Sequence, residues 1–145
     1  MKREYPDRPI VGVGGVVIKG ERVLLVRRGG EPLKGEWSIP GGTLELGEEL
    51  AAAARRELKE ETGLDVEPLQ VLSVFDRIIR DGRKIRYHYV IVDYACRLKG
   101  GKLAPASDVL DARWVRRRDL PRYHLTERAT AVVLCAFQFF NRKTS

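Results

Sequence analysis

Cysteines and long apolar segments are scarce in this sequence. The 145 residues include two cysteines, Cys96 and Cys135, which stand far apart and lack the spacing of a metal-binding or redox motif. We expect both to be small core residues with free thiols, which predicts a reducing, cytoplasmic location. No apolar run approaches the roughly 20 residues that cross a bilayer. Residues 1–7 carry no apolar segment of the kind found in signal peptides. A membrane partner is therefore not expected.

Repeats, low-complexity tracts and flexible linkers are also missing. Apolar residues make up 43% of the chain and charged residues 32%, a mixture typical of folded globular proteins. A chain of this length can bury a substantial core. We therefore expect a single domain over residues 1–145.

Acidic residues are outnumbered by basic ones, and the net charge of +7 favours an anionic partner. The densest basic cluster is the run of three arginines at residues 116–118, which we interpret as a solvated turn. The chain lacks the motifs of the common nucleic-acid-binding modules. A phosphorylated small molecule is thus the expected partner, and nucleic acid is the less expected one.

The hydrophobic pattern predicts an α/β fold. Asp81 and Gly82 separate two long apolar segments, as in a β-hairpin, and Gly63 follows a run of strong helix formers, as at a helix end. Residues 90–92 are apolar on both faces of their strand, which predicts a central strand covered on both sides. The expected strands are 11–18, 22–27, 37–39, 66–79, 84–98 and 112–115, with a turn at 40–42, and the expected helices are 48–62 and 125–141. This order predicts a mixed β-sheet between helices.

Three glutamates share one side of the first expected helix. At about 100° of rotation per residue, Glu57, Glu60 and Glu61 fall within an arc of roughly 100°. This arc borders the apolar stripe that contains Leu58, so repulsion and partial burial make each carboxylate costly to ionise. A divalent cation, Mg²⁺ or Mn²⁺, would compensate this cost. The alternative is a solvated face with ion pairs, for example between Arg56 and Glu60.

The surrounding residues favour the metal site. Residues 42–64 read GTLELGEELAAAARRELKEETGL. They resemble the Nudix box at every specified position, which here are Gly42, Glu48, Arg56, Glu57, Leu58, Glu60, Glu61, Gly63 and Leu64. Residues 37–42 resemble the family's approach to its loop, and the expected order of elements resembles the α/β/α Nudix sandwich. The resemblance implies a metal-dependent hydrolase that cleaves the diphosphate linkage of a nucleoside diphosphate derivative.

The resemblance also implies roles for individual residues. The residues that match the family's metal ligands are Glu57, Glu60, Glu61 and, through its carbonyl, Gly41. Arg56 and Glu48 match a pair that ties the helix to the preceding loop, and Glu48 can also reach the metal through water. Gly42 belongs to a glycine-rich loop that lets the backbone approach the phosphates.

Many relatives carry a further carboxylate, often the general base, on a loop before the last short strand. Asp108 stands in the better-matching place, and Asp111 is the second candidate. An aspartate that caps a turn is an equally good interpretation, and Glu57 is the alternative base. Asp93, in an apolar strand, is interpreted as a buried residue hydrogen-bonded to backbone, with a role in the site as its alternative. The expected catalytic residues are Glu48, Arg56, Glu57, Glu61 and Asp108.

Residues 23–28, 88–90 and 110–114 make the chain resemble small bacterial ADP-ribose pyrophosphatases, which implies cleavage of ADP-ribose to AMP and ribose 5-phosphate. Arg27 or Arg28 is expected to hold a phosphate or the ribose, and alternation along a strand turns one of them away. Four aromatic residues, Trp37, Phe75, Tyr87 and Tyr89, are candidates to stack on the base, although aromatic residues in strands more often belong to a core. Gly42 completes the expected substrate contacts.

Three alternatives remain open. Ile79 stands where one group of ADP-ribose hydrolases has a proline, so a housecleaning (deoxy)nucleoside triphosphate pyrophosphohydrolase is the second candidate. A catalytically silent Nudix-fold regulator would be expected to lose a ligand glutamate, whereas all three are present. A nucleic-acid-binding module would rest on the net charge alone. Assembly into a homodimer is also left open.

Overall fold

Strands supply most of the regular secondary structure. The computed structural model describes residues 2–144, which form β1 (Ile10–Lys19), β2 (Arg22–Arg28), β3 (Trp37–Ser38), β4 (Gly41–Thr43), α1 (Leu50–Thr62), β5 (Leu64–Asp81), β6 (Lys84–Gly101), β7 (Val109–Arg116), the 3₁₀ helix η1 (Arg117–Tyr123) and α2 (Glu127–Thr144). Each expected strand and helix is present in this part of the chain, and β4 and η1 are additional elements.

The strands form the mixed sheet that the sequence predicts, and their order in it is β3-β2-β1-β6-β5. β1 runs parallel to β6, and β5 runs antiparallel to β6. Along its other edge β1 has two partners, because β2 pairs with its last residues, 18–19, and β4 pairs with residues 12–14. β2 pairs in turn with β3 and β7. The edge of β1 thus carries two separate sets of strands.

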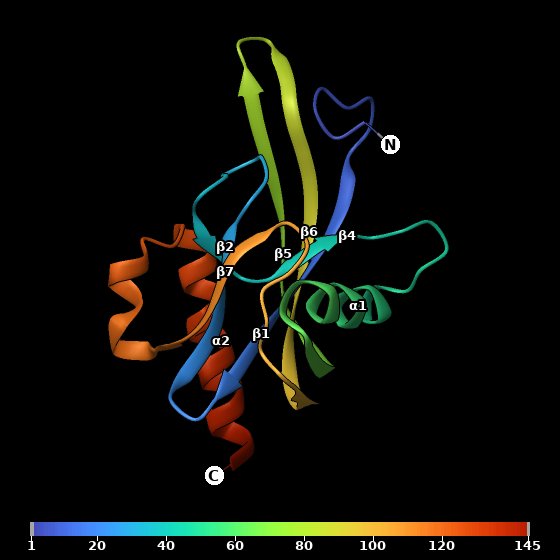
Figure 1. Ribbon diagram of the computed structural model, residues 1–145. Helices are drawn as coiled ribbons and strands as arrows, with labels where there is room; N and C mark the ends of the chain where they lie inside the picture. The colour runs from blue at the N-terminus through green and yellow to red at the C-terminus, as the bar shows by residue number, and fades with distance from the viewer. Residues whose placement is uncertain (1, 145) are drawn as a thin grey trace.

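The two α-helices cover opposite faces of the sheet (Figure 1). Val16 of β1 packs with Val133 and Phe137 of α2, whereas the next residue, Val17, packs with Leu58 of α1. Alternation along a strand sends neighbouring side chains to opposite faces, so one strand contributes to both cores. This arrangement is the α/β/α sandwich that the sequence predicts.

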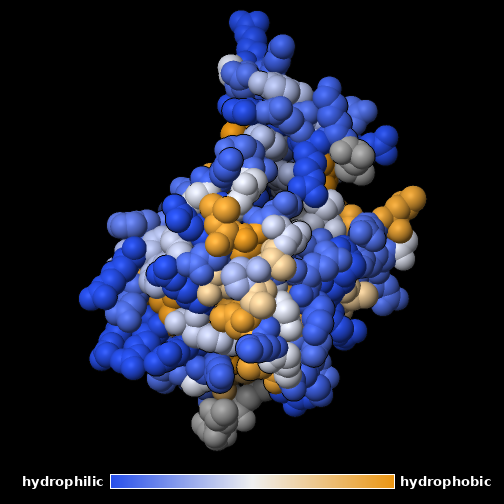
Figure 2. Space-filling view, viewed as in Figure 1, coloured by the Kyte–Doolittle hydropathy of each residue, from blue (hydrophilic) through white to orange (hydrophobic). Residues whose placement is uncertain are grey.

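β5 and β6 form the predicted long hairpin, which projects beyond the rest of the molecule (Figure 1). The turn pairs Asp81 with Lys84 around Gly82, whose φ of 61° is readily adopted by glycine. Figure 2 shows the projecting tip as hydrophilic. The N-terminal segment lies beside the hairpin, because the Tyr5 N–H donates to the Arg86 carbonyl at 2.7 Å.

Two expected boundaries are wrong. The expected turn at residues 40–42 includes the start of β4, because glycine lets the backbone of Gly41 approach β1 where a Cβ would collide with the carbonyl of Val13. Helix α1 begins at Leu50 rather than at residue 48. The chain makes a turn first, in which the Glu48 N–H donates to the Glu45 carbonyl at 3.0 Å.

The cysteines are free thiols as predicted, but only Cys96 is buried. Cys135 is exposed because α2 turns Val132 and Ala136 toward the sheet and leaves Cys135 on its outer side. The three arginines at residues 116–118 are exposed as expected, although they end β7 and begin η1 instead of forming a turn. Within residues 2–144, no helix combines the length and the apolar character needed to cross a bilayer.

Candidate active site

Helix α1 is oriented by its apolar face, which packs on the sheet. Its buried residues are Ala53, Ala54, Leu58 and Thr62. Gly63 ends the helix in the left-handed region with φ of 77°, and its N–H donates to the Lys59 carbonyl at 3.0 Å. Glu57 and Glu61 each precede a buried residue, so they lie at the border of the packed face. Glu60 lies farther out, as the helical spacing predicts.

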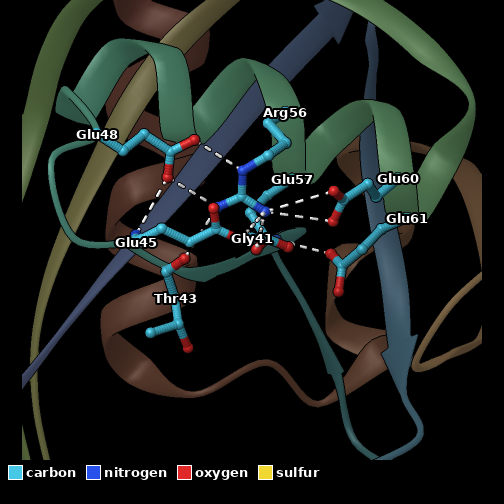
Figure 3. A network of polar contacts seen from close by, with 8 residues as sticks. All are labelled: Gly41, Thr43, Glu45, Glu48, Arg56, Glu57, Glu60 and Glu61. Atoms are coloured by element: carbon cyan, nitrogen blue, oxygen red, sulfur yellow. Dashed lines mark hydrogen bonds and ion pairs between the residues drawn. The ribbon is translucent and has the colours of Figure 1, made fainter. Parts of the chain in front are cut away.

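Arg56 is the centre of a polar network that joins α1 to the preceding loop (Figure 3). Its guanidinium donates to both carboxylate oxygens of Glu48, at 2.7 and 2.9 Å, and to the Thr43 carbonyl at 3.0 Å. It also forms ion pairs with Glu57 at 2.9 Å and with Glu60 at 3.3 Å. The Arg56–Glu60 pair that a solvated face would contain is therefore present, but as one part of a larger network.

The glutamates of α1 differ in exposure. The Glu57 side chain is 13% exposed, whereas the Glu60 side chain is 51% exposed. Glu57 lies over Gly42, where any Cβ would collide with its carboxylate. Glu61 accepts a hydrogen bond from the Gly41 N–H at 2.9 Å. The two glycines thus allow the backbone of β4 to lie directly against two of the carboxylates.

Burial makes this group of carboxylates costly to ionise. It raises the pKa of Glu61 to about 7, an effect that the Gly41 N–H opposes and the nearby Glu57 strengthens. Burial also raises the pKa of Glu57, against the hydrogen bond and charge of Arg56. The pKa of Glu48 is instead lowered, chiefly by its hydrogen bonds from Arg56. The unfavourable charge is therefore concentrated on Glu57 and Glu61.

The donor set suits a hard divalent cation. Within residues 2–144, no three metal-ligating side chains are already gathered around one point. Arg56 draws Glu57 and Glu60 toward itself, and Glu61 is held by the Gly41 N–H. The carboxylates nevertheless belong to neighbouring turns of one helix and border one cleft, and oxygen ligands of this kind are those that Mg²⁺ prefers. A cation there would also offset the cost of the buried charges.

A cleft of about 340 Å³ begins at these glutamates and extends across the sheet. Residues that line it include Glu57, Glu60, Glu61, Arg28, Trp37 and Tyr89. Gly41, Gly42 and Asp108 also belong to its lining. The cleft therefore has carboxylates at one end and aromatic side chains in its walls, an arrangement that suits a charged ligand with an apolar part.

Alternation along β2 separates the two candidate arginines. Arg28 lines the cleft and donates to the Pro32 carbonyl at 2.8 Å. Arg27 is exposed, lies outside the lining, and donates to the Gly35 carbonyl at 3.0 Å. Of the pair, only Arg28 is placed to touch a ligand. Trp37 packs edge-on against Tyr123 at 5.0 Å between ring centroids, which holds its ring beside the cleft.

The two candidate aspartates also lie in different places. Asp108 is exposed at the cleft, where its backbone carbonyl accepts a hydrogen bond from the Gly29 N–H at 2.7 Å. Its charge is close enough to Glu61 to raise the pKa of that carboxyl further. Asp111 lies outside the cleft lining and accepts a hydrogen bond from the Arg113 guanidinium at 3.0 Å. Only Asp108 is brought near the glutamates of α1.

Asp93 and Arg77 are two further charged residues in the lining of the cleft. Asp93 is buried as expected, but it lacks the expected hydrogen bond to backbone among residues 2–144 and lines the cleft, which agrees with its alternative placement in the site. Arg77, which lines the cleft from β5, is missed entirely. Burial lowers its pKa, an effect to which Arg28 adds. No local signal could have found Arg77, because its place depends on the β5–β6 register, which sets it opposite Tyr89.

The family to which this fold and box belong is confirmed by comparison with known proteins. The NUDIX domain family matches residues 8–135, so the chain belongs to the Nudix family. The chain is 34% identical over 114 residues to an ADP-ribose pyrophosphatase of Methanocaldococcus jannaschii, a match that covers 79% of this chain and 66% of that protein. It is 36% identical over 101 residues to a putative ADP-ribose pyrophosphatase of Bacillus subtilis, covering 70% of this chain and 47% of that protein. The chain thus spans less than two thirds of either relative.

Solved structures show the same fold. A MutT Nudix hydrolase from Burkholderia pseudomallei superposes with a TM-score of 0.77 at 28% identity, over 88% of this chain and 97% of that one. An ADP-ribose pyrophosphatase from Streptococcus suis superposes with a TM-score of 0.68 at 26% identity, over 90% and 92% of the two chains. The α/β/α arrangement is therefore that of Nudix hydrolases along most of its length.

Proposed function

We propose that the protein hydrolyses the diphosphate linkage of ADP-ribose to give AMP and ribose 5-phosphate. The observation that carries this proposal is the cleft itself, which joins half-buried carboxylates of α1 to walls that contain Trp37 and Tyr89. A diphosphate with a base at one end needs both the carboxylates, for its phosphates, and the aromatic walls, for its base. The relatives named ADP-ribose pyrophosphatases support the choice of substrate.

The proposed cofactor is Mg²⁺, with Mn²⁺ as its substitute. Its ligands would be Glu57, Glu60, Glu61 and the carbonyl of Gly41. When bound, the cation would neutralise charge on the diphosphate and help to activate water for attack. The raised pKa of Glu61, about 7, means that cation binding would displace a proton from part of the population near neutral pH.

The other residues of the cleft position the reactants. Arg56 and Glu48 hold the loop before α1 against the helix, and so keep Gly42 beneath Glu57. Arg28 is placed to contact a phosphate, since its guanidinium is a fixed cation at the cleft. Asp108 is the proposed general base because it lies on a loop at the cleft, with Glu57 as the alternative base.

The base end of the cleft is assigned to Trp37 and Tyr89. Tyr89 is 9% exposed and stacks on Tyr87 at 6.4 Å between ring centroids, so its ring is held in a fixed place. Trp37 is held on one side by the Arg113 guanidinium, 5.0 Å from its ring centroid. Rings that are already ordered lose little freedom when a base packs against them.

A (deoxy)nucleoside triphosphate pyrophosphohydrolase is the second candidate, because Ile79 stands where one group of ADP-ribose hydrolases has a proline. The two activities are separated by a substrate panel that contains ADP-ribose and the nucleoside triphosphates, with products identified by mass spectrometry. We expect ADP-ribose to have the highest kcat/KM in Mg²⁺, no turnover in excess EDTA, and a loss of several orders of magnitude in the Glu57→Gln variant. A nucleoside triphosphate whose kcat/KM exceeds that of ADP-ribose by about tenfold, or roughly 1.4 kcal/mol, would favour the second candidate.

The proposed location is the cytoplasm, because Cys96 and Cys135 are free thiols that a reducing compartment preserves. The proposed partner is a small nucleotide. A homodimer is a separate hypothesis, which sedimentation equilibrium of the purified chain tests directly.

A further inference from the structure

Asp93 lies in the wall of the cleft and has no role in the proposed chemistry. It is 4% exposed and occupies the middle of β6, between Gly14 of β1 and Ser73 of β5. A Cβ at Gly14 would collide with Oδ1 of Asp93, so the carboxyl group lies over the glycine in the space that a side chain would fill. An apolar residue would be the ordinary occupant of such a place.

The Asp93 carboxyl is poorly compensated. No donor among residues 2–144 gives it a hydrogen bond, and its charged neighbour, Arg77, forms no ion pair with it. Burial raises the pKa of the carboxyl to about 6, and the charge of Arg77 only partly opposes this rise. Among residues 2–144 no fully buried side-chain oxygen lacks a hydrogen-bond partner, so the Asp93 oxygens keep some access to the cleft. They are therefore placed to accept a hydrogen bond from a ligand there.

The carboxylates of α1 do not shift the pKa of Asp93, whose charged neighbour is Arg77. Asp93 shares its face of the sheet with Phe75, Tyr89 and Ile91, which also line the cleft. Phe75 is 8% exposed and Tyr89 is 9% exposed. Asp93 therefore shares the wall of the cleft with aromatic side chains, and its β1 neighbour Gly14 pairs with Gly41 next to Glu61.

We propose that Asp93 reads the nucleobase of the substrate by accepting a hydrogen bond from an exocyclic amino group. The assignment rests on the proposed function only in taking a nucleotide as the ligand. A buried acceptor favours a base with an amino group at the contacted position, such as adenine. It rejects a base with a carbonyl oxygen there, such as hypoxanthine, because two acceptors would then face each other without a proton between them.

The test compares adenine and hypoxanthine substrates. The protein and its variants are assayed for kcat/KM with ADP-ribose and with the hypoxanthine analogue IDP-ribose. Equilibrium binding of AMP and IMP is measured by calorimetry, which does not depend on turnover. We expect the unaltered protein to prefer adenine by roughly 10- to 100-fold in both measurements, the range for a hydrogen bond to a charged group.

Two variants separate reading of the base from a structural role. Asp93→Leu removes the acceptor and should reduce the preference to within about threefold. Asp93→Asn has both an acceptor oxygen and an NH2 donor, so it can also donate to the carbonyl oxygen of hypoxanthine and should lower the preference for adenine while the protein stays folded. Asp76→Asn is the matched control, because Asp76 is exposed on β5 and lies outside the cleft lining. It should behave like the unaltered protein.

The outcomes are distinguishable. Equal binding of AMP and IMP by the unaltered protein overturns the proposal, even if a variant fails to fold. A Leu variant that loses activity on both substrates by the same factor also overturns it, since a structural role would produce that result. A protein that prefers AMP to IMP but does not hydrolyse ADP-ribose supports the reading of the base and refutes the proposed function.

Discussion

Glu61→Gln should stabilise the protein when no metal is bound. Glu61 is the most strongly perturbed of the glutamates on α1, with its pKa raised by burial to about 7 from an ordinary value of 4.5. Glutamine keeps an oxygen that can accept the Gly41 hydrogen bond of 2.9 Å, but it carries no charge. The substitution therefore removes the cost of a buried charge and leaves the local contact in place.

The size of the effect follows from the displaced pKa. A rise from 4.5 to about 7 corresponds to about 3 kcal/mol, at roughly 1.4 kcal/mol per pH unit. Because the folded pKa is the higher one, the folded state binds the proton more tightly, and protonated Glu61 contributes fully to the free energy of unfolding below pH 4.5. This contribution to stability is lost as the pH rises through about 7. The variant should accordingly match the unaltered protein in acid and exceed it by up to about 3 kcal/mol at pH 8.

The measurement is urea unfolding in EDTA at a series of pH values, with the free energy of unfolding extrapolated to water. Glu60→Gln is the matched control because the Glu60 side chain is 51% exposed, and it should change stability little at any pH. Adding Mg²⁺ should make the unaltered protein more stable than Glu61→Gln, since a ligand stabilises the protein that binds it better. A Glu61→Gln variant that is less stable than the unaltered protein in EDTA across the whole pH range would refute the reasoning.

Three further predictions concern neighbouring residues. Asp108→Asn should lower kcat by roughly 10²–10⁴-fold with little change in KM, whereas Asp111→Asn should stay near the unaltered rate; equal small effects would leave Glu57 as the base. Gly42→Ala should weaken Mg²⁺ binding in calorimetric titrations, because its Cβ would displace the Glu57 carboxylate; unchanged affinity would contradict this. Arg56→Lys should lose the paired contact with the loop and lower stability in EDTA by about 1–3 kcal/mol, and unchanged urea unfolding would exclude that role.

Local features of the sequence were sufficient to predict the layers of the fold and the placement of the glutamates in residues 42–64. Helix α1, the β5–β6 hairpin and the succession of elements along the chain follow from periodicity and from the residues at the turns, which act over a few positions of the chain. The glutamates of α1 are the clearest case. Glu57, Glu60 and Glu61 lie on one helix, so their spacing alone places them on one side, and the structure finds them bordering one cleft.

Features that depend on pairing between distant segments were decided only by the tertiary structure. β4 is a strand because β1 approaches it, and the cleft position of Arg77 results from the register of β5 on β6. Arg28 rather than Arg27 faces the cleft because β3 and β7 fix how β2 is turned. Asp93 lies over Gly14 because β6 runs beside β1 in one register. A shift of one residue would send each of these side chains to the opposite face, and no local pattern in the sequence records that register.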